Sequence, residues 1–265
     1  MIGDVDREPA GETKEAMLSH PQVYDAIGEQ YRQQRVPDRR IAREVRTALG
    51  DVRTVCNVGA GAGSYEPHDL DVIAVEPSVR MIAQRDPTIP VIRATAEHLP
   101  FADKQFDASL AVLTVHHWTD PVRGLREMQR VSRRQVILTF DPALVDSLWL
   151  VRDYLPEVAE FEASRTIPLG RVRQTLGECT ISPVLIPDDC TDGFQAAYWK
   201  RPERYLDPNV RRSISTLSQL SAALVNRAMA RLAADIDSGA WSERYASLHA
   251  PPRMDFGYRL VVADG

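Results

Sequence analysis

The sequence predicts an α/β fold with a doubly wound, mostly parallel sheet, and two observations predict it. Short apolar segments alternate with segments of helical periodicity between residues 38 and 140. A glycine cluster follows the first apolar segment, and an acid follows the second. In such folds, a glycine turn after one strand and an acid after the next form a nucleoside-binding half-site. We therefore expect a ligand at the carboxyl ends of the first two strands.

Each element rests on its own pattern of apolar residues and turn residues. Strands are expected where β-branched and other apolar residues run between turn signals, at residues 53–58, 71–75, 91–93, 106–115, 135–140, 181–186 and 257–263. Helices are expected where apolar residues recur at helical spacing, at residues 23–35, 38–49, 77–83, 120–131, 144–155 and 165–176. The run at 106–115 is apolar enough for a strand buried on both faces.

The last two expected strands are separated by about seventy residues, which is far too long for a hairpin loop. Apolar residues at helical spacing predict an amphipathic helix over residues 214–236 of this insert. The expected organisation is a disordered lead at residues 1–17, a core at residues 18–187 and 257–265, and a helical cap insert at residues 188–256. Asp188, Asp189, Asp192, Tyr198 and Trp199 either face an aromatic or cationic ligand or form the turn and small core of this insert.

Composition narrows the classes of partner. The 265-residue chain has a net charge of −5 and 44% hydrophobic residues, so it lacks the basic excess that nucleic acid binding requires. No apolar run approaches the ~18 residues of a membrane helix, and the acidic N-terminus lacks the apolar core of a signal peptide. Three cysteines without a CxxC motif suit a reducing compartment. A cytoplasmic protein, monomer or homodimer, is expected, with neither a nucleic acid nor a membrane partner.

The glycine cluster comprises Gly59, Gly61 and Gly63, directly after the strand that ends at Val58. The alternative without a ligand-binding role is an ordinary tight turn between a strand and a helix. Glu76 ends the second strand, where a carboxylate can accept both ribose hydroxyls of a nucleoside. The alternative for Glu76, without a ligand-binding role, is a solvated charge at a strand end.

Four segments in order carry a family resemblance: VCNVGAGAG, VIAVEPS, AEHLPFADKQFDASLAVLTVHHW and REMQRVSRRQVIL. Together they resemble the motifs of the class I S-adenosylmethionine-dependent methyltransferases, in particular the branch called type 11, which includes quinone-biosynthesis methyltransferases. The resemblance covers roughly residues 50–140, about a third of the chain. It implies a seven-stranded Rossmann-like sheet whose last two strands form an antiparallel hairpin, with the insert as a substrate cap.

The resemblance also implies S-adenosylmethionine as cofactor, transfer of its methyl group to an O, N or C atom of a small-molecule acceptor, and a set of cofactor-binding residues. These residues are Asn57, Gly59, Ala60, Gly61, Glu76, Pro77, Thr95, Ala96, Glu97 and Leu113. One position departs from the family pattern, because Thr95 stands where related sequences often have an Asp that contacts the adenine amine. Adenine recognition then depends on the Thr95 hydroxyl, the Ala96 backbone and the Glu97 side chain.

A helix before the core extends the expected site. Tyr24, Tyr31 and Arg35 are seven and four residues apart and therefore lie along one helix face. In similar enzymes such a helix covers the donor, and an aromatic residue or an Arg contacts the donor carboxylate. The alternative is helix packing with a solvated Arg.

Two histidines are the candidate catalytic residues. His116 and His117 follow the fourth strand beside the expected donor site, and histidine titrates near neutrality, so either is a candidate general base. The alternative is that one of them shapes the loop with Trp118. A metal site is not expected, because adjacent residues on a strand point to opposite faces and no other histidines or cysteines have ligand-like spacing. Two other functions stay open: an NAD(P)-dependent oxidoreductase, or a non-catalytic nucleoside-binding protein.

Overall fold

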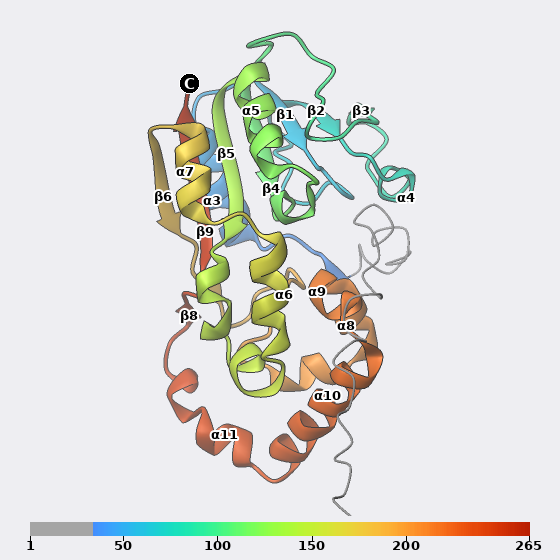
Figure 1. Cartoon of the computed structure of the whole chain (residues 1–265), viewed down its shortest axis with the longest axis vertical. Coiled ribbons are helices and arrows are strands. Elements are labelled where there is room, and N and C mark those ends of the chain that lie inside the picture. Colours follow the sequence, from blue (N-terminus) through green and yellow to red (C-terminus); the bar gives the residue numbers. More distant parts are fainter. Residues whose placement is uncertain (1–33) are drawn as a thin grey trace, which may run out of the picture.

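A seven-stranded sheet forms the upper half of the molecule in the computed structural model, which describes residues 34–265 (Figure 1). The strand order is β3-β2-β1-β4-β5-β9-β6, and β9 is antiparallel to both of its neighbours while the other pairs are parallel. The strands are β1 (Thr54–Val58), β2 (Asp71–Val75), β3 (Val91–Ile92), β4 (Phe106–Val112), β5 (Ser132–Phe140), β6 (Cys179–Pro183) and β9 (Tyr258–Asp264). The doubly wound, mostly parallel sheet and its terminal antiparallel pair are thus confirmed.

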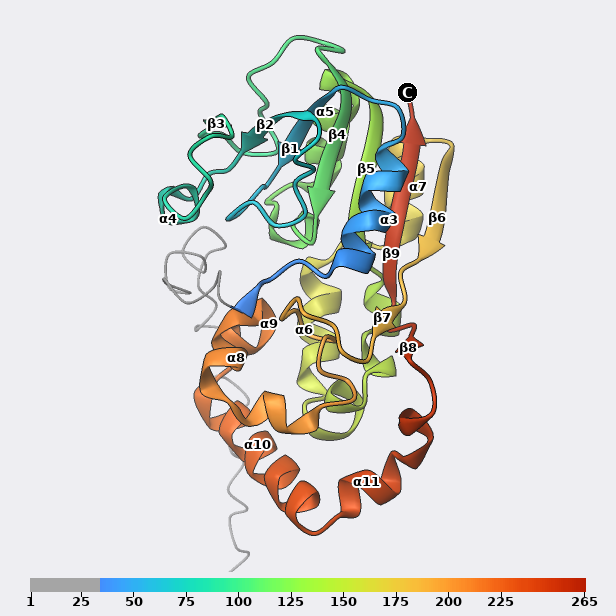
Figure 2. The same cartoon turned by 180° about the vertical axis from the view of Figure 1, so that it is seen from behind.

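Helices cover both faces of this sheet. α5 (Pro121–Val131) and α7 (Leu169–Leu176) lie on one face (Figure 1), and α3 (Arg39–Leu49) lies on the other (Figure 2). α4 (Val79–Ile82) follows β2 near the sheet edge. Asp38 and Asp120 begin α3 and α5 by accepting hydrogen bonds from the backbone N–H of Arg40 and Arg123, as good N-cap residues do.

The central strands are buried on both sides, which explains their uninterrupted apolar runs. Val55, Leu110 and Leu138 belong to the hydrophobic cluster on the α3 face, whereas Cys56 and Ile137 belong to the cluster beneath α5 and α7. Burial raises the pKa of the Cys56 thiol to about 12, so this cysteine behaves as a small apolar core residue.

A helical lobe occupies the lower half of the molecule (Figures 1 and 2). Two separate chain segments build it, residues 142–165 and residues 186–256. Its elements are η2 (Pro142–Ser147), η3 (Leu150–Tyr154), α6 (Glu157–Arg165), β7 (Ile186–Pro187), η4 (Pro202–Leu206), α8 (Pro208–Ser213), α9 (Ser215–Gln219), α10 (Ala222–Asp237), α11 (Ala240–Arg244), η5 (Ala246–His249) and β8 (Arg253–Met254). Trp149 joins the two segments, because its ring packs against Tyr154, Tyr205, Trp241 and Tyr245 with centroids 5.2–5.7 Å apart.

The structure corrects several element boundaries. β4 ends at Val112 rather than at 115, and residues 144–155 form a 3-10 helix and a turn of π-helix rather than one α-helix. α6 was not predicted, and α7 begins at Leu169 rather than at 165. The expected strand 181–186 is β6 followed by β7, which pairs with β8 in a separate sheet.

The expected helix over residues 214–236 is also wrong as a single element. α9 ends at Gln219, and Ser221 begins α10 by capping the N–H of Leu224. The spacing of apolar residues stayed in phase across this break, so periodicity alone did not reveal it. A serine cap inside an apolar pattern was the available signal.

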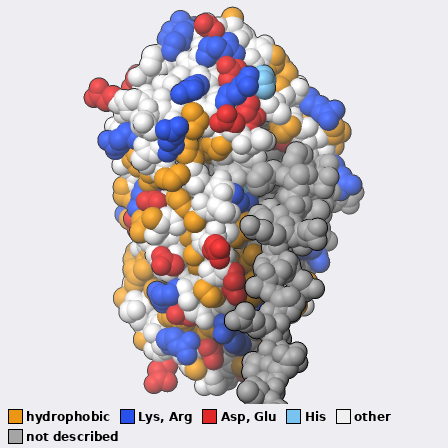
Figure 3. Space-filling model, viewed as in Figure 1, with side chains coloured by type: hydrophobic (Ala, Val, Ile, Leu, Met, Phe, Trp, Pro, Cys, Tyr) orange, Lys and Arg blue, Asp and Glu red, His pale blue; other side chains and the backbone are white. Residues whose placement is uncertain are grey.

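Acidic and basic side chains are interspersed over the visible face of the molecule (Figure 3). Within residues 34–265, no helix is both long and apolar enough to cross a membrane. The expected lead, 1–17, and the expected helix over 23–35, apart from its last two residues, lie outside the described residues.

Candidate functional site

Three adjoining pockets open near the carboxyl ends of β1, β2 and β4. The glycine-turn pocket is lined by Arg35, Asn57, residues 59–62, Ser64, Glu76, Met81 and residues 112–114. The Glu76 pocket is lined by Gly59, residues 76–79, Arg93, residues 95–97, Thr114 and residues 117–119. The aromatic pocket lies between the sheet and the helical lobe and shares Arg35 and Leu113 with the glycine-turn pocket and His117 with the Glu76 pocket. The three pockets are therefore neighbours that share lining residues.

All three glycines of the turn, Gly59, Gly61 and Gly63, have positive φ. Gly59 has φ 66°, and a Cβ at this position would lie 2.2 Å from the Thr114 Oγ1, so β1 and β4 approach too closely for any side chain. Gly61 has φ 52°, and a Cβ there would meet no atom within 4 Å. The space in front of Gly61 is therefore open to a ligand.

Glu76 is buried at the end of β2 and faces the turn. Its Oε2 accepts a hydrogen bond from the Gly61 N–H at 2.8 Å, and its Oε1 accepts one from the Ser78 N–H at 2.9 Å. Burial raises the pKa of this carboxyl group, although the two N–H donors oppose that rise. Since a carboxylate has about four lone-pair sites, Glu76 keeps acceptor capacity toward the pocket.

A buried ion pair supports the turn from behind. The Arg85 guanidinium contacts the Glu66 carboxylate at 2.6 Å and donates to the carbonyl oxygens of Ala60 and Gly61. The Asn57 Nδ2 donates to the same Glu66 carboxylate at 2.8 Å. The Asn57 Oδ1 is left buried without a hydrogen-bond partner among the described residues, in a side chain that lines the glycine-turn pocket. A buried acceptor in that state calls for a donor.

Residues 95–97 line the opposite wall of the Glu76 pocket. Thr95 is exposed, Ala96 is buried and Glu97 is half-buried. The Glu97 Oε1 accepts a hydrogen bond from the Asp120 N–H at 3.1 Å, which ties this wall to the start of α5.

The chain changes direction directly after β4. Leu113 has φ 49°, a conformation that non-glycine residues adopt rarely and that is concentrated at functional sites. It lines both the glycine-turn pocket and the aromatic pocket. Val115–His117 then form a turn of 3-10 helix rather than a continuation of the strand. The argument that His116 and His117 point to opposite faces is therefore wrong, and their rings pack with centroids 3.9 Å apart.

Both histidines line the aromatic pocket, which encloses about 630 Å³ including its open mouth. Its remaining walls come mainly from aromatic and aliphatic residues of the sheet and the lobe. These include Phe140, Val145, Leu148, Phe194, Ile214, Phe256 and Tyr258. Glu162 also lines it and is ion-paired with Arg165 at 2.6 Å. Thr216 donates a hydrogen bond to the same carboxylate and so joins α9 to α6.

Arg35 lies where the aromatic pocket and the glycine-turn pocket meet. Its Nε contacts the Asp192 Oδ1 at 2.5 Å, so the Arg35 side chain is ion-paired and largely buried rather than solvated. Tyr24 and Tyr31, expected on the same helix face, lie outside the described residues.

The structure brings the other predicted positions together. Asn57, Gly59, Ala60, Gly61, Glu76 and Leu113 line the glycine-turn pocket, and Pro77, Thr95, Ala96 and Glu97 line the Glu76 pocket. The sequence analysis did not identify Thr114, Arg85, Glu66 or Glu162 as site residues. Thr114 could have been predicted, since a small polar residue after an apolar strand lies at the same edge of a parallel sheet as the glycine turn.

Of the cap residues considered, Tyr198 and Trp199 are buried in the lobe and line none of the three pockets. The Trp199 Nε1 donates to the carbonyl oxygens of Ile186 and Pro187. Asp188 and Asp189 are paired with Lys200 and Arg40. These contacts favour the reading in which the residues build the insert itself.

Known proteins share this architecture. The family model described as "Methyltransferase domain" matches residues 55–140. A crystal structure from Anabaena variabilis, provisionally named a methyltransferase from an antibiotic biosynthesis pathway, superposes with a TM-score of 0.81 at 34% sequence identity. The match covers 88% of this chain and 100% of that one. The chain belongs to the class I S-adenosylmethionine-dependent methyltransferases.

Curated relatives in the same family match over shorter segments. The demethylmenaquinone methyltransferase of Paenarthrobacter aurescens is 37% identical over 113 residues, which are 38% of this chain and 44% of that protein. The demethylmenaquinone methyltransferase of Renibacterium salmoninarum is 38% identical over 104 residues, which are 36% and 44% of the two chains. The chain thus spans less than half the length of these relatives.

The chemistry of the pockets fits the family's cofactor, S-adenosylmethionine. Its ribose hydroxyls are hydrogen-bond donors, and Glu76 is a buried acceptor. Its ammonium group is also a donor, and the Asn57 Oδ1 is an acceptor without a partner among the described residues. Its carboxylate matches a guanidinium, which Arg35 supplies at the pocket rim.

Proposed function

We propose that the protein transfers a methyl group from S-adenosylmethionine to an uncharged, largely apolar small molecule. One observation carries the proposal: Leu113 and Arg35 line both the glycine-turn pocket and the aromatic pocket. A donor in the first pocket and an acceptor in the second then meet at a common boundary. Bringing two reactants together in this way supplies much of the rate acceleration in a displacement reaction.

The donor's ribose belongs beside Glu76 in this proposal. The carboxylate is already fixed by the N–H groups of Gly61 and Ser78, so it needs no reorganisation when it accepts the hydroxyls. Pro77, Thr95, Ala96 and Glu97 form the adenine wall. The half-buried Glu97 carboxylate is the candidate acceptor for the adenine amine, in place of the Asp that Thr95 replaces.

The amino-acid end of the donor belongs in the glycine-turn pocket. The Gly61 N–H already bonds to Glu76, so the open space before Gly61 serves close approach rather than hydrogen bonding. Asn57 accepts from the ammonium group through Oδ1, and Ala60 lies beside it in the turn. Arg35, together with Tyr24 and Tyr31 of the expected covering helix, interacts with the carboxylate.

The sulfonium of the bound donor supplies an already activated methyl group, so the protein's task is to orient and to exclude water. Leu113 shapes the boundary at which the acceptor atom meets the donor. If that atom must lose a proton, His116 or His117 is positioned to take it, since both rings line the acceptor side. If no proton is lost, the pair supports the loop that precedes Trp118.

The pocket lining favours an acceptor without a net charge. Among the described residues, Arg35 and Glu162 are the Arg and Glu that face the aromatic pocket, and each is neutralised by a partner. Four aromatic side chains line it, namely Phe140, Phe194, Phe256 and Tyr258. Because this proposal assigns Arg35 to the donor carboxylate, a phosphorylated acceptor would lose its hydration without gaining a cation of its own, which is unfavourable.

Calorimetry with S-adenosylhomocysteine and with NAD⁺ tests the proposal. Binding of the first and not the second supports the methyl donor, and the reverse result supports the NAD(P)-dependent oxidoreductase. Mass spectrometry then follows methyl transfer to a panel of neutral phenols and matched carboxylates. Donor binding with no product from any acceptor would favour a non-catalytic nucleoside-binding protein.

We further propose a cytoplasmic monomer or homodimer that does not bind nucleic acid. The net charge of −5 supports the absence of a nucleic acid partner, and three cysteines, all free, support a reducing compartment. Size-exclusion chromatography with light scattering tests the oligomeric state.

A further inference from the structure

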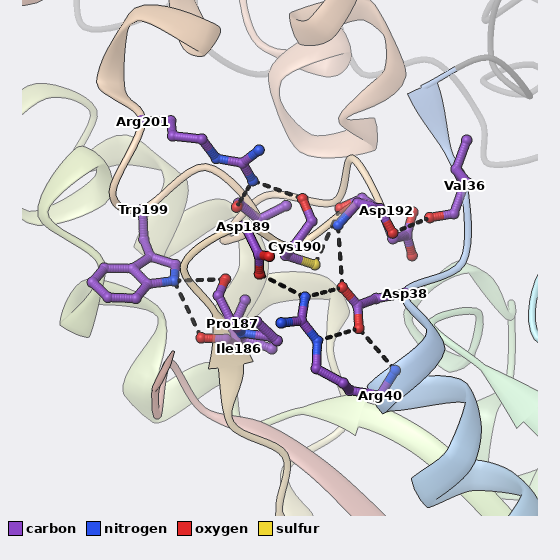
Figure 4. A network of polar contacts seen from close by, with 12 residues as sticks. Val36, Asp38, Arg40, Ile186, Pro187, Asp189, Cys190, Asp192, Trp199 and Arg201 are labelled. Carbon is purple, nitrogen blue, oxygen red and sulfur yellow. Dashed lines mark hydrogen bonds and ion pairs between the residues drawn. The ribbon is translucent and has the colours of Figure 1, made fainter. Parts of the chain in front are cut away.

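The chain segment that precedes α3 is fastened to the start of the insert. The Gly193 N–H donates to the Gln34 carbonyl oxygen at 2.8 Å, and the Thr191 N–H donates to the Asp38 Oδ2 at 3.3 Å. Arg40 bridges Asp38 and Asp189, each at 2.7 Å. Figure 4 shows Asp38 and Arg40, at the start of α3, meeting Asp189 of the insert in one polar cluster, with Asp192 beside them.

Asp192 lies at the centre of this junction and is fully buried. Its Oδ1 accepts from the Arg35 Nε at 2.5 Å, and its Oδ2 accepts from the Arg35 NH2 at 3.3 Å and from the Tyr65 hydroxyl at 2.9 Å. Charge-assisted hydrogen bonds are strong in buried surroundings, where little water screens them. Asp192 therefore holds the Arg35 and Tyr65 side chains together.

The close approach at this junction is built into the backbone. A Cβ on Gly193 would lie 2.5 Å from the Gln34 carbonyl oxygen and 2.9 Å from the Tyr198 hydroxyl. Arg35 and Asp192 also form an antiparallel β-bridge. A glycine beside Asp192 thus permits the contact that aligns its carboxylate with Arg35.

Asp192 connects three parts of the site. Arg35 lines both the glycine-turn pocket and the aromatic pocket, and Tyr65 directly follows the turn residues of the glycine-turn pocket. On its own chain, Asp192 stands two residues before Phe194, Gln195 and Ala196, which form a wall of the aromatic pocket. Asp192 itself lines neither pocket.

We propose that Asp192 is a positioning residue that couples donor binding to the placement of the acceptor wall at residues 194–196. The inference rests on the proposed function, because it treats the glycine-turn pocket as the donor site. When a donor carboxylate engages Arg35, the guanidinium is fixed, and Asp192 transmits that restraint to the wall. Such coupling is reciprocal, so an ordered wall also strengthens donor binding.

Hydrogen–deuterium exchange of the full chain with and without saturating S-adenosylhomocysteine tests this coupling. In the unmodified protein, the ligand should slow exchange of amides in residues 59–65 and in residues 194–201, the latter on the order of tenfold. In Asp192→Asn, the turn should still be protected at saturation, and protection of residues 194–201 should fall to about twofold or less. Asp189→Asn is the matched control and should behave like the unmodified protein, since Asp189 is exposed and pairs with Arg40.

The outcomes separate the two proposals. Failure of S-adenosylhomocysteine to bind the unmodified protein overturns the proposed function and the inference with it. Binding with undiminished protection of residues 194–201 in Asp192→Asn overturns the inference alone. If Asp192→Asn does not fold, Tyr65→Phe removes a single hydroxyl from the same carboxylate. Reduced protection of residues 194–201 in that variant supports the coupling, and full protection overturns it.

Discussion

Glu76 accepts a hydrogen bond from the backbone N–H of Gly61 at 2.8 Å, so the acid at the end of β2 is joined directly to the turn after β1. The two features that identify a nucleoside site in the sequence are therefore parts of one rigid arrangement. A carboxylate held in this way presents its remaining lone pairs to a ligand in a fixed direction. Preorganisation of this kind lowers the entropy that binding loses.

The first prediction concerns the affinity that Glu76 provides. Glu76→Ala leaves two ribose hydroxyls without an acceptor, so binding of S-adenosylhomocysteine should weaken by about 1–3 kcal/mol. Asp71→Ala, at the exposed opposite end of β2, is the control and should bind as the unmodified protein does. Calorimetry measures both constants. Equal affinity of Glu76→Ala and the unmodified protein would remove Glu76 from the donor site.

The second prediction concerns pH. Burial raises the pKa of the Glu76 carboxyl above its ordinary value of 4.5, so the charged form is less favoured in the free protein than in an unfolded chain. This group therefore favours folding at low pH, and its contribution is lost as pH rises through the raised pKa. Donor binding follows the opposite trend, because hydroxyls prefer the carboxylate as acceptor.

Affinity for S-adenosylhomocysteine should thus fall as pH is lowered through the raised pKa of Glu76. Glu76→Gln should lose most of this pH dependence, and its stability at neutral pH should be equal to or higher than that of the unmodified protein. Calorimetric titrations at several pH values and urea unfolding measure the two effects. A pH dependence of binding that persists unchanged in Glu76→Gln would assign it to another group.

A third prediction uses two glycines with the same backbone constraint. Gly61 and Gly50 both have positive φ, 52° and 70°, and a Cβ on either meets no atom within 4 Å. Valine at either position should lower the free energy of unfolding by about 1–2 kcal/mol or somewhat more, because an L side chain strains a backbone with positive φ. Gly61→Val should also abolish donor binding, because the valine side chain would enter the glycine-turn pocket. Gly50 follows the last residue of α3 and lies outside the three pockets, so Gly50→Val should bind the donor normally. Retained binding in Gly61→Val would place the ligand elsewhere.

The buried pair Arg85–Glu66 gives a fourth prediction. Arg85→Met leaves the buried Glu66 carboxylate unpaired and removes two donors to the turn, so the free energy of unfolding should fall by about 3–5 kcal/mol. Adding Glu66→Gln removes the unpaired charge and should recover much of that loss. Arg46→Met, which breaks an exposed pair with Asp69, should cost about 1 kcal/mol or less. Urea unfolding would contradict this reading if the buried and exposed substitutions cost the same.

The sequence predicted the sheet, and the grouping of Gly59, Gly61 and Glu76 at one edge of it, for a local reason. A parallel strand, its turn and the next strand end are close in sequence, so Gly59, Gly61 and Glu76 were readable as one pattern. Both faces of β1, β4 and β5 are buried, so their sequences are long apolar runs that predict strands clearly. The polar supports of the turn, Arg85 and Glu66, lie outside that pattern.

The aromatic pocket was not predictable in the same way. Phe140, Phe194 and Tyr258 come from β5, the insert and β9, and only the tertiary fold brings them together. Leu113 directly follows β4 in a left-handed conformation, and no propensity rule foresees that the strand ends at Val112 while the apolar run continues to Val115. The many aromatic residues of the insert were visible in the sequence, but no local pattern distinguishes Phe194 and Phe256, which line the pocket, from Tyr198, which packs inside the lobe.

The last prediction separates those two groups. Phe194 lines the aromatic pocket and packs against Tyr258 at 4.8 Å, while Trp199 is fully buried in the lobe and lines no pocket. Phe194→Ala should raise the KM for a neutral phenolic acceptor from the panel by about tenfold or more. Because the wall is coupled to the donor site, it should also weaken binding of S-adenosylhomocysteine, but by much less than it raises the KM. Trp199→Ala should instead lower the free energy of unfolding by about 3–5 kcal/mol, because it empties a core site and removes the indole donor to Ile186 and Pro187.

Steady-state kinetics, calorimetry and urea unfolding distinguish the two variants. An unaltered KM in Phe194→Ala would mean that the acceptor does not contact this wall, and the lobe would then serve the fold rather than the acceptor at that position.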